Sequence, residues 1–230
     1  MAREIKVLSS IATREAYNEI VPQFERDTGH TVVTAWAGTV DIVKRLSAGG
    51  EVHDLVVLSS VELDDLIKQG KIAAGSRVDI AKSGIGVAVR ADVPKPDIGS
   101  AEALKRTLLA AKTVGYPSGP SGVYMAGLIE RMGIADEIKP KHRGVPSGGT
   151  IGTIVASGEC EIGFQQISEL VHVKGIDYVG PLPPDVQRVT VFPTGIPAGA
   201  PNPEGAKALV KFLTTPASAT VIRKHGLETG

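Results

Sequence analysis

The sequence of 230 residues contains little cysteine and few aromatic residues. Its single cysteine, Cys160, excludes a disulfide framework and a cluster of thiolate metal ligands. Because Cys160 directly precedes an apolar strand pattern, we expect it to be a small buried hydrophobic residue. Aromatic residues make up 4% of the chain, which argues against a surface that stacks nucleobases.

The sequence also lacks an excess of either charge. Its 25 Lys and Arg residues balance 25 Asp and Glu residues, so the formal net charge is zero. Nucleic acid is therefore not an expected partner, because neutralising phosphates requires a basic footprint. No run of about 18 apolar residues is present, so we expect no membrane insertion.

The first ten residues lead directly into a strand pattern and contain no apolar segment typical of a signal peptide. The sequence as it stands therefore predicts a cytoplasmic protein. A periplasmic location follows instead if a leader has been removed. Both locations stay open at this point.

What the sequence does contain is a globular composition, with 42% hydrophobic and 22% charged residues. Strand and helix patterns alternate through the first part of the chain, with strands expected at 5–8, 31–35 and 54–58 and helices at 12–28, 40–48 and 61–69. This alternation predicts a parallel sheet with helices on both faces. Ligands of such sheets bind beyond the carboxyl ends of the strands. Those ends carry polar or small residues: Ser9 and Ser10, Gly38 and Thr39, and the serine pair 59–60.

A second α/β block follows, with strands expected at 78–80, 84–89, 113–115 and 161–166 and helices at 100–111, 123–132, 135–139 and 151–157. Two of its loops are rich in Gly and Ser and lead into helices. Residues 115–124 include Ser121 and Gly122, and residues 147–150 include Gly148, Gly149 and Thr150. Free N–H groups at a helix N-terminus favour an anion there. Ordinary strand-to-helix turns are the alternative, because Gly, Pro and Ser populate turns for conformational reasons alone.

The C-terminal part of the chain adds a strand at 188–192 and helices at 203–213 and 216–225. We therefore predict an α/β fold of two lobes, each a mostly parallel sheet flanked by helices. Residues 1–82 with 188–230 form the first lobe and residues 83–187 the second. Two hinge crossings join the lobes, with a ligand cleft between them.

Several segments, in this order and with this spacing, carry a resemblance to a known family: 7–16, 23–25, 54–55, 115–124, 156–163, 208–213 and 226–228. The chain resembles the type II periplasmic solute-binding proteins. Within them it is most similar to the molybdate-binding-protein-like branch, which also includes enzymes of the aconitate isomerase type. The resemblance covers essentially the whole chain.

The resemblance implies that hydroxyls and backbone N–H groups hold a small anion. The residues that it places at the ligand are Ser9, Ser10, Gly38, Thr39, Ser121, Gly122, Gly148, Gly149, Thr150, Gln165 and Gln166. Three departures concern the ligand: the family serine of the first loop falls near Ala12, the second serine-rich loop has become residues 37–39, and Gln166 replaces the family tyrosine. Carboxamides offer donors and acceptors, which suit a di- or tricarboxylate better than molybdate.

Two functions follow. The first is a monomeric substrate-binding protein for such an anion, which delivers it to an ABC transporter permease if the protein is exported. The second is an enzyme of the aconitate isomerase type that moves an allylic proton and therefore needs a general base. Candidate bases are Tyr124, Glu169, Asp41 and the pair His142–Arg143. A cytosolic sensor of a small acid is a third reading.

No Ser-His-Asp spacing, metal-ligand cluster, phosphate-binding loop or dinucleotide fingerprint occurs in the sequence. We therefore expect neither a metal nor any other cofactor.

Overall fold

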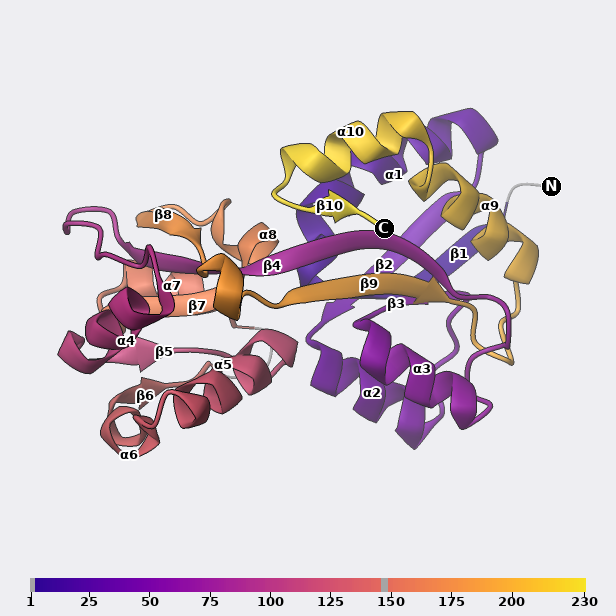
Figure 1. Cartoon of the computed structure of the whole chain (residues 1–230). Helices are drawn as coiled ribbons and strands as arrows, with labels where there is room; N and C mark the ends of the chain where they lie inside the picture. The colour runs from indigo at the N-terminus through magenta and orange to yellow at the C-terminus, as the bar shows by residue number, and fades with distance from the viewer. Residues whose placement is uncertain (1–2, 146–148) are drawn as a thin grey trace. The chain divides into compact units, whose positions relative to one another are not determined.

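A computed structural model describes residues 3–145 and 149–230 of the chain (Figure 1). The chain divides into two compact units: unit 1 is Met1–Lys82 with Thr190–Gly230, and unit 2 is Ser83–Val189. The chain passes from one unit to the other twice, at residues 82–83 and again at 189–190.

The sheet of unit 1 is built around β1 (Glu4–Ser10). This strand pairs in parallel with β2 (Thr31–Ala37) on one side and with β3 (Leu55–Val57) on the other. The antiparallel strand β9 (Val189–Gly195) follows β3, and the short β10 (Glu228–Thr229) pairs with the first part of β4 (Val78–Arg90). Both faces of β1 are apolar, because Ile5 and Val7 pack into one core and Leu8 into another.

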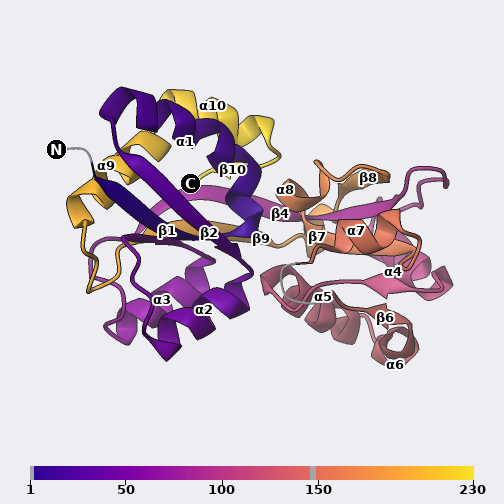
Figure 2. The ribbon, with the colours of Figure 1, turned by 180° about the vertical axis from the view of Figure 1, so that it is seen from behind.

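Helices cover both faces of this sheet (Figures 1 and 2). One face carries α1 (Arg14–Thr28), α9 (Pro203–Leu213) and α10 (Pro216–Lys224), and the other carries α2 (Thr39–Ala48) and α3 (Ser60–Lys68). The 3₁₀ turn η1 (Ile11–Thr13) joins β1 to α1. Lys224 at the end of α10 forms an ion pair with Glu19 of α1 at 2.8 Å. The C-terminal helices therefore complete the core that the first strands begin.

A buried carboxylate ties these distant parts of unit 1 together. Asp54 is 3% exposed, and its two oxygens accept from Lys6 N at 2.8 Å and from Asn202 N at 2.7 Å. Asn202 in turn caps α9, since its Oδ1 accepts from Gly205 N at 3.1 Å. One side chain thus fixes the start of β3 against β1 and against the N-cap residue of α9, 148 residues later.

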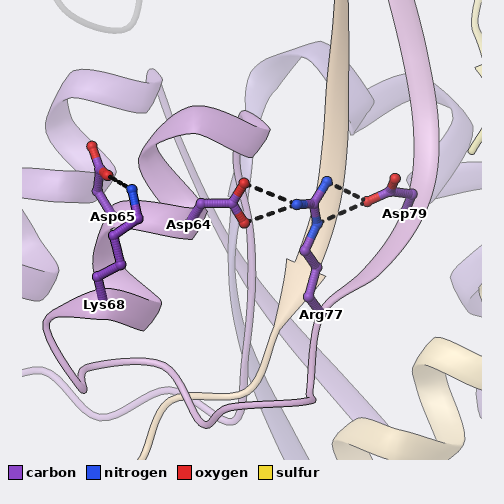
Figure 3. Close-up of polar contacts among 5 residues, drawn as sticks. All are labelled: Asp64, Asp65, Lys68, Arg77 and Asp79. Carbon is purple, nitrogen blue, oxygen red and sulfur yellow. Dashed lines mark hydrogen bonds and ion pairs between the residues drawn. The ribbon is translucent and has the colours of Figure 1, made fainter.

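A second polar contact joins α3 to the start of β4 (Figure 3). Nη1 of Arg77 donates to both oxygens of Asp64 at 2.8 and 2.9 Å, while Nε and Nη2 donate to Asp79 Oδ1 at 3.1 and 3.0 Å. The neighbouring pair Lys68–Asp65 is more exposed and lies within α3. The planar guanidinium matches two carboxylates at once, which a lysine could not do.

In unit 2, β4 pairs antiparallel with β7 (Ile162–Gln166) and with β8 (Ile176–Pro181), while β5 (Val114–Gly115) pairs in parallel with β7 and with β6 (His142–Arg143). The helices α4 (Ala101–Ala110), α5 (Pro120–Arg131) and α6 (Ala135–Ile138) share one core with Phe164 of β7. The helix α7 (Ile151–Ala156) packs against the neighbouring strand residue, Gly163. A Cβ atom added to Gly163 would lie only 2.5 Å from the Ile151 side chain. Alternation along β7 therefore separates the two helix layers.

The remaining short elements of unit 2 are α8 (Ile167–Leu170), which follows β7 directly, and the 3₁₀ turns η2 (Lys139–Lys141) and η3 (Pro184–Val186). Cys160 is 1% exposed, which confirms the prediction that it is a buried residue. Burial raises the pKa of its thiol to about 11.

The structure corrects two sequence-based element predictions and adds one strand. Residues 78–90 form one strand, not two, and Gln187 supports it after Gly84: its Nε2 donates to Ile85 O at 3.0 Å and its Oε1 accepts from Ile85 N at 2.9 Å. The added strand is β8, for which the sequence analysis predicted no element. The helix α5 begins at Pro120, because proline suits the first position of a helix.

Among the described residues, none of the helices combines the length and the apolar character that crossing a membrane requires.

We predict that Asp54→Asn lowers the free energy of unfolding by about 1.5–3 kcal/mol, because one of two buried N–H groups would then face an NH₂ group. Urea denaturation followed by circular dichroism measures this loss. Asp65→Asn is the matched control, since its carboxylate is exposed and, within the described part of the chain, its one ion pair is with Lys68 of the same helix. Equal losses in the two variants would contradict this role for Asp54.

Candidate functional site

The two serines at the end of β1 have different hydrogen-bonding roles. Thr13 Oγ1 donates to Ser10 O at 3.0 Å and lies 3.0 Å from Ser9 Oγ. Because the one hydroxyl proton of Thr13 is already used, Ser9 must be the donor in the second contact. Ser10 Oγ accepts from Ala12 N at 3.3 Å, and its own proton has no acceptor among the described residues. Ser10, not Ser9, is therefore able to donate to a ligand.

The N-terminus of α2 is open. Its N-cap is Gly38, which has no side chain to accept from the first N–H groups, and Thr39 is buried at the first helical position. Asp41 N and Ile42 N both donate to Gly38 O at 3.0 Å, so the amides of the two preceding residues are left for another partner. A Cβ at Gly38 would meet no atom within 4 Å. Packing therefore does not require glycine at this position.

The serine pair at the end of β3 differs from the other two strand ends. Ser59 Oγ donates to the carboxylate of Glu62 in the first turn of α3. The Ser59 hydroxyl is therefore already used. The Glu62 carboxylate lies in the first turn of α3, where its negative charge would repel an anionic ligand.

The N-terminus of α5 also lacks a side-chain cap. Gly119 is the N-cap, and Pro120 has no N–H group. Ser121 is 3% exposed, and neither its amide nor its hydroxyl has a hydrogen-bond partner among the described residues. At Gly122 a Cβ would lie 1.5 Å from the carbonyl oxygen of Pro117, so only glycine fits there. Gly122 therefore shapes the loop, while Ser121 supplies two donors.

The N-terminus of α7 is closed by a side chain from β7. Ile151 N donates to Gln165 Oε1 at 2.7 Å, and Gln165 Nε2 donates to Glu169 Oε2 at 2.6 Å. Gly149 is partly buried, and Gly148 lies outside the described residues. Thr150 precedes the helix and does not cap it; its Oγ1 is buried with no partner among the described residues.

Gln165 and Gln166 are both buried, but they do not act as a pair. Consecutive strand residues point to opposite faces. Gln165 lies on the face of α7, and Gln166 lies on the face of Phe164 with α4, α5 and α6. Gln166 is also the N-cap residue of α8. The Gln165 side chain therefore bonds to α7 and α8, and the Gln166 side chain lies on the opposite face of the sheet.

Ser168 belongs with these residues, and the sequence analysis did not select it. It is 4% exposed, and its Oγ is buried with no hydrogen-bond partner among the described residues. The available signal was its place: a hydroxyl in the first turn of a helix that begins immediately at the end of a buried strand.

The candidate bases differ in how far they are engaged. Tyr124 OH donates to Val186 O at 2.9 Å. His142 Nε2 donates to Tyr116 O at 3.1 Å, and the two rings stack with centroids 3.9 Å apart. Burial, and then the charge of Glu130, raises the pKa of Tyr116. Arg143 is exposed. Of the two carboxylates, Asp41 lies in the first turn of α2, and Glu169 Oε2 accepts from Gln165 Nε2 at 2.6 Å.

A cavity of about 700 Å³ in unit 2 lies elsewhere. Its lining includes Val89, Ala111 and Ile162, at the end of β7 opposite to Gln165 and Gln166, and none of the predicted ligand-binding residues. Within the part of the chain that the structure describes, no group of His, Cys, Asp and Glu side chains could hold a metal ion.

The chain is similar to several known proteins over nearly its whole length. The aconitate isomerase of Pseudomonas sp. is 36% identical over 229 residues, covering 97% of this chain and 87% of the relative. The molybdate-binding protein ModA of Escherichia coli (strain K12) is 23% identical, covering 97% of this chain and 88% of ModA. The periplasmic molybdate-binding protein of Azotobacter vinelandii has the same fold, with a TM-score of 0.82 at 17% identity, covering 98% of this chain and 99% of that one.

These likenesses confirm the predicted α/β fold and the resemblance to the molybdate-binding-protein-like branch. The family model for bacterial extracellular solute-binding proteins matches residues 5–228. The chain therefore belongs to the bacterial extracellular solute-binding protein family.

Proposed function

We propose that the protein binds a di- or tricarboxylate of the aconitate class and interconverts cis- and trans-aconitate. The observation that carries this proposal is the 36% identity to an aconitate isomerase over 97% of the chain, against 23% to a molybdate-binding protein over the same share. The oxyanion-binding fold alone does not distinguish the two functions, because one fold hosts many sites.

The donors that the described residues leave open support an anionic ligand. We propose that Ser10, Gly38, Thr39, Ser121, Gly149 and Thr150 contact it through hydroxyls and backbone N–H groups. The carboxamide of Gln166, which already interacts within the protein, is a further proposed contact. Ser9, Gly122 and Gln165 support these contacts from within the protein. The residue Gly148, which lies outside the described residues, remains a predicted member of the site.

Uncharged donors are well suited to this ligand class. A hydroxyl or amide that donates to a carboxylate makes a charge-assisted hydrogen bond without the desolvation cost of a buried cation. The carboxamide of Gln166 offers both a donor and an acceptor, so it also suits a ligand that carries a hydroxyl or a protonated carboxyl group. Molybdate in its fully ionised form offers acceptors only.

The second candidate function is delivery of a small anion to an ABC transporter, without chemistry. It is supported by the family to which the chain belongs and by the fold that it shares with a periplasmic molybdate-binding protein. This function requires a location outside the cytoplasm. The two candidates differ in turnover, and therefore one set of measurements separates them.

We predict that cis- and trans-aconitate raise the melting temperature of the protein more than molybdate, tungstate or sulfate does, because ligands that bind only the folded state stabilise it. Thermal shift over this panel, with citrate included, measures the preference. An absorbance assay then follows the conversion of cis- to trans-aconitate. Stabilisation without conversion supports the transport candidate, and a shift by molybdate alone contradicts the carboxylate proposal.

We predict that Ser121→Ala raises the dissociation constant of the anion that gives the largest shift by roughly ten-fold or more, since one charge-assisted hydrogen bond contributes about 1.5–3 kcal/mol. Isothermal titration calorimetry measures the change. Ser118→Ala is the control, because Ser118 belongs to the same loop but is exposed. An unchanged dissociation constant in Ser121→Ala would remove this residue from the site.

A further inference from the structure

We infer that Glu169 is the general base that transfers the proton in the proposed isomerisation, and that Gln165 is its positioning residue. This inference rests on the proposed function. It assigns the two roles to one hydrogen-bonded chain inside unit 2: Ile151 N, the Gln165 carboxamide and the Glu169 carboxylate.

The orientation of Gln165 follows from its first partner. A backbone N–H group can only donate, so the Gln165 atom that faces Ile151 N at 2.7 Å must be the carboxamide oxygen. Its NH₂ group is then directed at Glu169 Oε2, at 2.6 Å. Because Gln165 is 3% exposed and its backbone pairs with Gly86, the carboxamide has little freedom to turn. The Gln165 carboxamide that donates to Glu169 is therefore itself fixed in orientation by its hydrogen bond with Ile151 N.

The contact is of the kind that an ionised carboxylate makes. A donor–acceptor distance of 2.6 Å is short for an N–H···O bond, and such bonds are strongest when the acceptor carries a charge. A general base must be present in its proton-accepting form and in a fixed position. The Gln165 donor supports both conditions for Glu169.

Two residues that adjoin this hydrogen-bonded chain in sequence carry buried hydroxyls. Thr150 precedes Ile151 and Ser168 precedes Glu169, and the Oγ1 of Thr150 and the Oγ of Ser168 are buried with no partner among the described residues. A buried hydroxyl without a partner costs about 1–3 kcal/mol. A ligand carboxylate that accepted from them would remove that cost, so this part of unit 2 is suited to bring a substrate to Glu169.

The other candidate bases are less suited. Tyr124 donates its hydroxyl proton to Val186 O, so it still carries the proton that a phenolate base would have lost. His142 donates from Nε2 to Tyr116 O, which leaves Nδ1 as an acceptor, but its neighbours Lys141 and Arg143 are not hydroxyl residues, unlike Ser168 beside Glu169. Asp41 in the first turn of α2 is the remaining carboxylate. Among the described residues no donor orients the side chain of Asp41 as Gln165 orients Glu169, and Asp41 is therefore the competing assignment in the test below.

The proposed step balances without an oxidant or a reductant. Glu169 removes a proton from the methylene carbon next to the double bond of cis-aconitate, which breaks one C–H bond. The electron pair spreads over three carbons, and the double bond moves by one position. The protonated Glu169 then returns the proton to the carbon at the other end, which forms the new C–H bond. A single base of this kind predicts that part of the proton is retained when the reaction runs in D₂O.

We predict that Glu169→Gln lowers kcat for cis-aconitate by about a hundred-fold or more, the usual contribution of a general base. The thermal shift that aconitate produces stays within about a factor of two of the wild type, because the side chain keeps its size. Glu159→Gln is the control: this glutamate is exposed in the same unit and accepts from Ser157 Oγ. Asp41→Asn tests the competing base, and melting without ligand checks that each variant is folded.

The role of Gln165 has its own readout. In Gln165→Glu the new carboxylate faces Glu169, and like charges raise the pKa of such a pair. The acidic limb of the kcat–pH profile should then move upward by about one unit, whereas Gln165→Met should lower kcat without that displacement. A role limited to packing would leave the limb in place in both variants.

The outcomes separate this inference from the function on which it rests. If the wild type does not convert aconitate, whether or not it binds it, both are overturned. If the wild type converts aconitate and Glu169→Gln keeps its kcat, or if Asp41→Asn alone loses it, the assignment of Glu169 is overturned and the proposed function stands. Loss of kcat in Glu169→Gln alone, with binding retained, supports the inference.

Discussion

The hydrogen bond from Ile151 N to the Gln165 carboxamide is the contact on which the candidate site of unit 2 depends. It closes the N-terminus of a six-residue helix that is too short to hold itself in place. It also fixes the direction of the Gln165 NH₂ group, and through that group the carboxylate of Glu169. One buried side chain of β7 thus links the strand to both α7 and α8. Buried polar chains of this kind are stable only when each member is satisfied.

The helices differ in how their N-termini are satisfied, and the difference separates structural from available donors. Ser100, Asn202 and Thr215 cap α4, α9 and α10 with their own side chains. By contrast, α2 and α5 begin at Gly38 and Gly119, which cannot do so. The absence of a cap costs stability, because N–H groups that lack a partner are unfavourable unless water or a ligand meets them. Leaving donors open at two long helices is consistent with a site for an anion.

The chain belongs to the bacterial extracellular solute-binding protein family and is 36% identical to an aconitate isomerase. Binding an anion requires donors, whereas moving a proton on a bound substrate requires one further group with the right form and position. In the mechanism that we infer, that group is the Glu169 carboxylate, three residues beyond the end of β7, which accepts from the carboxamide of Gln165 in the strand itself.

The sequence by itself determined the α/β class, the alternation of strands and helices, and the strand ends and loops where polar residues gather, because periodicity and turn chemistry are local properties. Only the tertiary structure decided which of those residues are available. The Ser9 hydroxyl donates to Thr13, and the Ser59 hydroxyl donates to Glu62. Gln165 and Gln166 point to opposite faces, β4 continues because Gln187 supports Ile85 from 102 residues away, and Ser168 is a buried hydroxyl. Each of these depends on a hydrogen-bond partner or a neighbouring face that the fold supplies, and a local pattern does not contain that information.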